Sequence, residues 1–190
     1  DMLMKYGIPY QIVGGVRFYE RKEIKDIMAY LRLIYNPADD ISFLRIINRP
    51  KRGIGAGTLG KVQDFAEAEG LNLYQAALRS KENPALSGTY AKRVLHFTEI
   101  IEELRAEQEE IALARLTEKL LDKSGYRHNL EEEKTAEAES RLENIEELFS
   151  VINEYMKNSE NNTLAGFLEE VTLMADIDSM DEEQSVLTLM

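Results

Sequence analysis

The chain has 190 residues, of which 44% are hydrophobic, enough for the core of one large or two small domains. It has no cysteine and only His96 and His128, which excludes disulfides and thiolate metal sites and predicts no metal centre. There is no apolar run of about 18 residues and no basic-then-apolar leader. We therefore expect a cytoplasmic protein that makes no membrane contact.

The charge is unevenly distributed along the chain. The formal net charge is −12, which argues against a protein that coats nucleic acid over its whole surface. Residues 41–63, however, contain five basic side chains and no acid, whereas residues 99–154 contain 17 acids and 7 bases. This layout predicts contact with phosphate at one place and repulsion of phosphate elsewhere.

The first part of the chain has mixed α/β character. A short apolar strand is predicted at 10–13, followed by a helix from Arg21 to about Tyr35 that Asn36-Pro37 ends. Asp39 or Asp40 can cap the next helix, and Pro50 ends it because the residue before proline avoids the α region. The apolar face of this helix is predicted to be Ile41, Phe43, Leu44, Ile46 and Ile47.

The remainder is almost entirely helical in pattern. Helices are predicted from the cap Thr58 to about 69, from Asn72 to 79, from Ser87 to about 108, at 113–123, after Thr135, and from Asn162 or Thr163 to about 175. The long helix after Ser87 should turn Tyr90, Val94, Phe97, Ile100, Ile101 and Leu104 inward. A β-type run ends the chain at 185–190. We expect a mainly α fold: a multi-helix bundle at 28–184, flanked by short strands of an incomplete α/β domain at 1–27 and 185–190, and hence a fragment.

The segment 48–59, Asn-Arg-Pro-Lys-Arg-Gly-Ile-Gly-Ala-Gly-Thr-Leu, is the strongest candidate site. Gly53 and Gly55 permit a tight turn with positive φ and leave backbone N–H groups unshielded, and Ile54 would anchor the turn in the core. Lys51 and Arg52 add positive charge, and a helix start capped by Thr58 adds further free N–H groups. Together they predict a helix-hairpin-helix-like turn that holds DNA phosphate. The alternative is an ordinary glycine-rich turn.

A second basic turn follows at Lys123-Ser124-Gly125. Gly125 is expected to end a helix as its C-cap, and the turn is a second candidate for phosphate contact. The sequence contains no Gly-x-x-x-x-Gly-Lys-Ser/Thr loop and no Asp-Glu pair after an apolar strand. We therefore expect no catalytic residue, no bound cofactor and no ATP hydrolysis from this chain.

Several ordered motifs resemble the PcrA/UvrD/Rep group of superfamily 1 DNA helicases, PcrA-type members above all. They are Gly-Ile-Pro-Tyr at 7–10, Val-Gly-Gly-Val-Arg-Phe-Tyr-Glu-Arg-Lys-Glu-Ile-Lys-Asp at 13–26, Tyr-Leu-Arg-Leu-Ile at 30–34, Asn-Arg-Pro-Lys-Arg-Gly-Ile-Gly at 48–55, Asp-Lys-Ser-Gly-Tyr at 122–126, and Ser-Arg-Leu-Glu-Asn-Ile-Glu-Glu-Leu at 140–148.

The resemblance implies that residues up to about Ile27 belong to subdomain 2A, a RecA-like motor lobe, and that the helical body is subdomain 2B, with 2A resuming near 185. It implies a parent helicase that uses ATP and magnesium, moves 3′ to 5′ in repair and replication, and contacts this region through its subdomains 1A, 1B and 2A. Lys51, Arg52, Gly53, Ile54, Gly55 and Thr58 would contact duplex DNA or a single/double-strand junction. A second hypothesis makes the acidic body a docking and autoinhibitory module for a regulatory protein.

Overall fold

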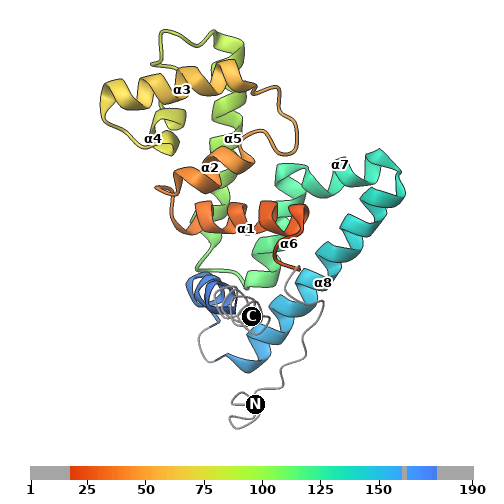
Figure 1. Ribbon diagram of the computed structural model, residues 1–190. Helices are drawn as coiled ribbons and strands as arrows, with labels where there is room; N and C mark the ends of the chain where they lie inside the picture. Colours follow the sequence, from red (N-terminus) through yellow and green to blue (C-terminus); the bar gives the residue numbers. More distant parts are fainter. Residues whose placement is uncertain (1–17, 160–161, 175–190) are drawn as a thin grey trace, which may run out of the picture.

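The computed structural model describes residues 18–159 and 162–174, and this part of the chain is built from helices (Figure 1). They are α1 (Lys22–Tyr35), α2 (Asp40–Ile46), α3 (Ala56–Glu69), α4 (Leu73–Leu78), α5 (Gly88–Glu107), α6 (Leu113–Ser124), α7 (Tyr126–Glu133) and α8 (Ala136–Asn158), followed by helical residues 164–174. The expectation of a mainly α fold is confirmed. None of the helices within these ranges is both long and apolar enough to cross a membrane.

Short polar side chains begin several helices where the sequence predicted them. Asp39 caps α2 by accepting from the Ser42 amide at 3.0 Å, and Thr135 caps α8 by accepting from the Ala138 amide at 3.1 Å. Asn72 and Gln75 form a reciprocal capping box at α4. Thr163 accepts from the Gly166 amide at 3.2 Å, so it is the residue that begins the last described helix.

The helices are arranged in two groups joined by α5 (Figure 1). At one end α3 packs on α4, and α4 contacts both α2 and α5. At the other end α6, α7 and α8 pack on one another, and α1 contacts α5, α6 and α8. The α2–α3 loop (residues 47–55) therefore lies where the two groups meet.

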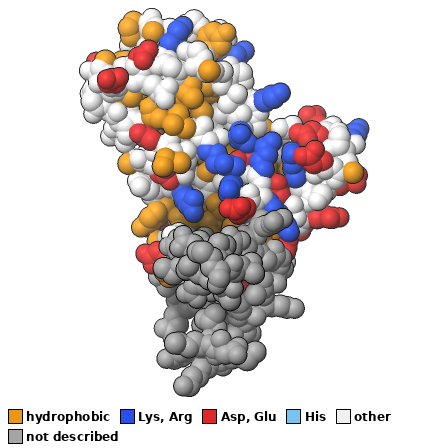
Figure 2. Space-filling model, viewed as in Figure 1, with side chains coloured by type: hydrophobic (Ala, Val, Ile, Leu, Met, Phe, Trp, Pro, Cys, Tyr) orange, Lys and Arg blue, Asp and Glu red, His pale blue; other side chains and the backbone are white. Residues whose placement is uncertain are grey.

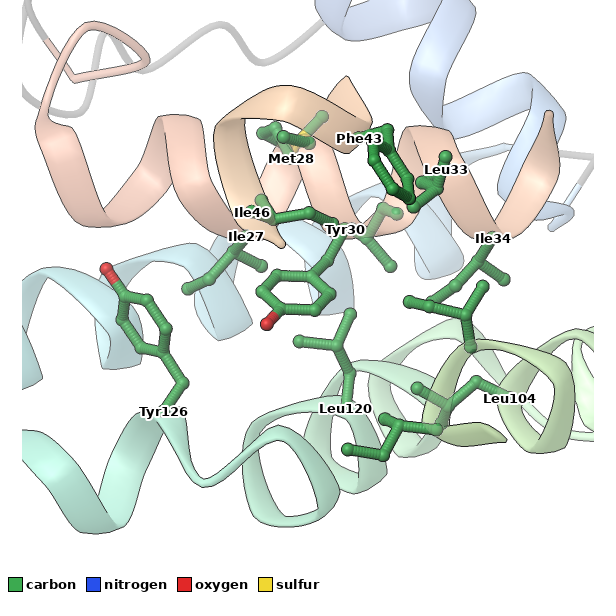
Figure 3. Packing of buried hydrophobic residues seen from close by; sticks show 14 of the residues in the cluster. Ile27, Met28, Tyr30, Leu33, Ile34, Phe43, Ile46, Leu104, Leu120 and Tyr126 are labelled. Carbon is green, nitrogen blue, oxygen red and sulfur yellow. The ribbon is translucent and has the colours of Figure 1, made fainter. Parts of the chain in front are cut away.

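The core is centred on α1, whose Ile24, Ile27, Leu31 and Ile34 have no exposed surface. Figure 3 shows Tyr30 of α1 lying between Phe43 and Ile46 of α2 on one side and Leu120 of α6 on the other. Burying each such side chain contributes about 1.5–3 kcal/mol, so this packing fixes the position of α2 and of the loop that follows it.

Polar contacts join α1 to α8 across more than 120 residues of sequence. The Arg21 guanidinium donates to Asn144 Oδ1 at 2.7 Å and to Glu147 Oε2 at 2.8 Å. The Asn144 amide donates in turn to Glu23 Oε1 at 2.6 Å. Two of the sequence motifs that carry the helicase resemblance therefore meet in space.

Two sequence-based predictions about the helices were wrong, and one helix was missed. Ile41 and Leu44 of α2 are 84% and 40% exposed, because only Phe43, Ile46 and Ile47 face the core. Tyr90 is 42% exposed, because it lies on the first turn of α5, beyond the part that packs on α1 and α6. Helix α7 was not predicted, because only Tyr126 and Leu130 of its residues are buried.

The expected strands at 10–13 and 185–190 lie outside the described residues. The proposed division between the two subdomains after Ile27 would fall inside α1, which packs in the helical body along its whole length. The position of that division stays a prediction.

Candidate nucleic-acid interface

The α2–α3 loop is shaped by one side chain, Asn48. Its Oδ1 accepts from the backbone N–H of Arg52 at 2.7 Å and of Ile54 at 3.2 Å. Between these two amides, Gly53 takes the left-handed conformation, with φ of +70°. Ile54 is 3% exposed and packs into the core, as the sequence predicted. The turn is therefore anchored from inside, and its outer edge is backbone.

Arg52 is turned inward, contrary to the expectation that it faces a ligand. Its guanidinium donates to the Tyr30 hydroxyl at 2.6 Å and to the backbone carbonyls of Ile46 at 3.1 Å and Ser124 at 3.1 Å, with longer contacts to Ile47 and Pro50 at 3.4 and 3.3 Å. Ile46 and Ser124 are the last residues of α2 and α6, where unpaired carbonyls collect. Arg52 therefore joins the ends of two helices.

Tyr30 of α1 links Arg52 to the backbone of the loop. Its hydroxyl accepts from Arg52 and donates to the carbonyl of Arg49 at 2.5 Å. Burial raises the pKa of Tyr30 to about 12, against the opposing effect of the Arg52 charge, so the hydroxyl keeps its proton at neutral pH. The loop is thus held by a partly buried hydrogen-bond network.

Helix α3 begins three residues earlier than predicted. Its N-cap is Gly55, in extended backbone with φ of −85° and ψ of 178°, so the predicted positive φ at Gly55 and the predicted Thr58 cap are both wrong. Thr58 lies in the first turn and is buried. Within the described part of the chain, no side chain caps the amides of this turn, which leaves them available to an anion.

A groove of about 530 Å³ lies over this loop and the start of α3. The side chains and backbone that line it are those of Asn48, Lys51, Gly53, Gly55, Gly57, Thr58, Tyr90 and Arg93. None of these residues is acidic, and two of them, Lys51 and Arg93, are exposed cations. The groove therefore combines positive charge with the unpaired amides of a helix N-terminus.

Arg93 and Tyr90 were missed by the sequence analysis, and both come from α5. The Arg93 guanidinium donates to the Gly53 carbonyl at 3.1 Å and lies 5.3 Å from the Tyr90 ring centroid. A Cβ atom at position 53 would stand 2.6 Å from Arg93 Nη1, the far end of a flexible and exposed side chain that can shift, so it is the positive φ that favours glycine there. Their i, i+3 spacing on an exposed helix face was the available signal.

The second candidate turn is occupied by internal contacts. Lys123 Nζ lies 2.5 Å from Glu103 Oε2, and this pairing lowers the pKa of Glu103 and raises that of Lys123. Ser124 is buried, and its carbonyl accepts from Arg52. Gly125 has φ of +74° and is the C-cap of α6, as predicted. Arg52 thus joins the two turns. Lys123 is paired with Glu103, so it offers no unpaired charge to a phosphate.

Comparison with known proteins places the whole chain in one group. A family profile describing the UvrD-like helicase C-terminal domain matches residues 1–190. The chain is 47% identical over 184 residues to the ATP-dependent DNA helicase PcrA of Bacillus subtilis, covering 97% of this chain and 25% of that protein. It is 45% identical over 192 residues to PcrA of Staphylococcus aureus strain Mu50, covering 100% of this chain and 26% of that protein. The chain spans about a quarter of the length of these relatives.

Proposed function

Because the chain belongs to the UvrD-like helicase C-terminal domain family, we propose that its α2–α3 groove holds the sugar–phosphate backbone of duplex DNA beside a strand junction. One observation carries the proposal. Exposed Lys51, exposed Arg93 and the uncapped amides of α3 line one groove, and no acidic residue lines it. This is the chemistry by which proteins bind a phosphate without reading bases.

The parent protein would be an ATP-dependent DNA helicase, as the PcrA relatives are named, and it would move 3′ to 5′. ATP and magnesium would bind in its other subdomains, and this region would hold the duplex that is being unwound. The binding residues would be Lys51, Arg93 and the backbone of Gly53, Gly55 and Thr58, with Ile54 and Arg52 supporting the loop from inside.

A docking role for a regulatory protein is the second candidate. Ile41 and Leu44 project from one face of α2, and Leu78 of the neighbouring α4 is 42% exposed, so these helices display apolar surface. This surface lies on the helices rather than in the groove, so a variant of the groove tests the DNA proposal without altering the docking candidate.

The test is an anisotropy titration of the 190-residue chain with a tailed duplex at several salt concentrations. Affinity should be independent of base sequence, and Lys51→Gln should flatten the dependence of log K on log salt by about 1. The matched control is Lys157→Gln, which removes the same charge from the last turn of α8 and should leave the slope unchanged. Equal slopes for the wild type and a folded Lys51→Gln variant would leave the docking hypothesis as the better one.

A further inference from the structure

A second group of basic side chains surrounds one buried carboxylate, that of Asp26 on α1. Asp26 is 1% exposed. Arg45 Nε lies 2.8 Å from its Oδ1 at an angle that makes an ion pair without a hydrogen bond, and the Tyr126 hydroxyl donates to its Oδ2 at 2.9 Å. Arg45 offsets the charge of the carboxylate and Tyr126 satisfies Oδ2, whereas Oδ1 accepts no hydrogen bond within the described residues.

Arg49 is therefore a cation in excess at this position. Its Nη1 stands 3.6 Å from Asp26 Oδ2, beyond hydrogen-bond distance, and its side chain is 45% exposed. The backbone of Arg49 is fixed on both sides, because its N–H donates to the Ile46 carbonyl at 2.9 Å and its carbonyl accepts from Tyr30 at 2.5 Å. Among the described residues, no hydrogen bond is made by its guanidinium.

Lys22 lies on the same side of α1 as Asp26, because the two are four residues apart on the helix. Its side chain is exposed, and its carbonyl accepts from Arg45 at 3.3 Å. The next carboxylate of α1, Glu23, is buried and accepts from Asn144 of α8. Arg45 and Arg49 therefore contact Asp26, and Lys22 lies one helical turn before it on α1. Figure 2 shows Lys and Arg side chains gathered in the middle part of this view of the molecule.

We propose that Arg45 and Arg49, held beside Asp26, form with the exposed Lys22 a second phosphate-binding surface for the DNA that the α2–α3 groove holds. The inference rests on the proposed function and extends the contact from the loop to α1. Arg49 and Lys51 are two residues apart, so their Cα atoms lie within about 7 Å. A DNA strand carries one charge per about 3.4 Å of helix axis, so neighbouring phosphates of one strand can reach both side chains.

Asp26 has a defined part in this surface. A buried carboxylate costs free energy unless it is paired, so it holds guanidinium groups near it whether or not DNA is present. Arginine presents five donors in a planar fork, and contact with one carboxylate oxygen leaves most of them for a second anion. The phosphate would thus meet cations already in position, which lowers the ordering cost of binding.

The experiment compares Arg49→Gln, Lys51→Gln and the double variant by anisotropy titration with the tailed duplex over a range of salt. Each single variant should lower the salt slope by about 0.9 and the double variant by about 1.8, because each phosphate contact releases counterions separately. Arg49→Lys keeps the charge and should keep most of the slope. Arg115→Gln removes the same charge at the start of α6, remote from the α6–α7 turn, and is the matched control.

The outcomes separate this inference from the proposed function. A reduced slope for Lys51→Gln with an unchanged slope for folded Arg49→Gln would overturn the second surface and leave the groove proposal standing. A reduced slope for Arg49→Gln with an unchanged slope for Lys51→Gln would overturn the proposal that the α2–α3 groove binds DNA. It would also overturn the proposal that the groove and the second surface contact the same DNA. Unchanged slopes for both would overturn both. If Arg49→Gln does not fold, Lys22→Gln replaces it, and an unchanged slope there refutes the second surface.

Discussion

Replacing Arg52 by methionine tests whether this arginine supports the loop or contacts DNA. Methionine has a similar length and no charge, so it removes the donors without opening a large cavity. The carbonyls of Ile46 and Ser124 and the Tyr30 hydroxyl would each lose one hydrogen-bond donor. We expect a less stable chain whose loop no longer holds its position against the α6–α7 turn.

The size of the loss follows from these contacts. Three of the five hydrogen bonds are 3.1 Å or shorter, and each contributes about 1 kcal/mol net when water can replace part of it, as for this half-buried side chain. The free energy of unfolding should fall by about 3 kcal/mol, which lowers Tm by about 6–12 °C for a chain of this size. Lysine at position 52 should recover little, since an ammonium cannot reach acceptors from two helices at once.

Chemical denaturation followed by circular dichroism, with duplex titrations at several salt concentrations, separates the two roles. Arg52→Met should reduce stability, whereas Lys51→Gln should change it by less than about 0.5 kcal/mol and act on the salt slope instead. A supporting role for Arg52 is refuted if the free energy of unfolding of Arg52→Met lies within about 1 kcal/mol of the wild-type value while its salt slope is flatter by about 1. That result would place the guanidinium on phosphate.

Two further predictions follow from the glycines and the buried tyrosines. Gly53→Val should cost at least about 1–2 kcal/mol because φ is +70° there, and it should weaken duplex binding because the new side chain displaces the Arg93 guanidinium. Gly55→Ala has no atom within 4 Å of its Cβ and should fold normally, so equal unfolding midpoints of the two variants in urea would contradict this. Burial raises the pKa of Tyr30 to about 12 and also raises those of Tyr74 and Tyr126, so the stability they contribute is complete below about pH 10 and falls as the pH rises toward about 12. The chain has nine tyrosines, and titration of all of them near pH 10 in a still-folded chain would count against it.

The helices could be predicted from sequence because their signals are local. Asp39, Asn72 and Thr135 cap helices within three residues of themselves, and Gly70 and Gly125 end helices through their own backbone conformation. A pattern of this kind needs no knowledge of what packs against it.

The roles of adjacent basic residues could not be predicted in this way. Lys51 and Arg52 look alike in sequence, but only Arg52 meets the carbonyl ends of α2 and α6, which are 78 residues apart in the chain (46 to 124). Arg93 joins the groove because α5 returns past the loop, 40 residues after Gly53. Such roles depend on tertiary packing, which charge counts and spacing do not contain.

The two hydrogen bonds accepted by Asn48 should also be visible in the exchange of backbone hydrogens with solvent. The amides of Arg52 and Ile54 share one acceptor, the side-chain oxygen of Asn48, whereas within the described part of the loop no acceptor is found for the intervening amide of Gly53. Deuterium should therefore enter position 53 fast and positions 52 and 54 slowly. Asn48→Ala would make all three fast together, so a single asparagine determines which amides of the loop can open and which remain closed.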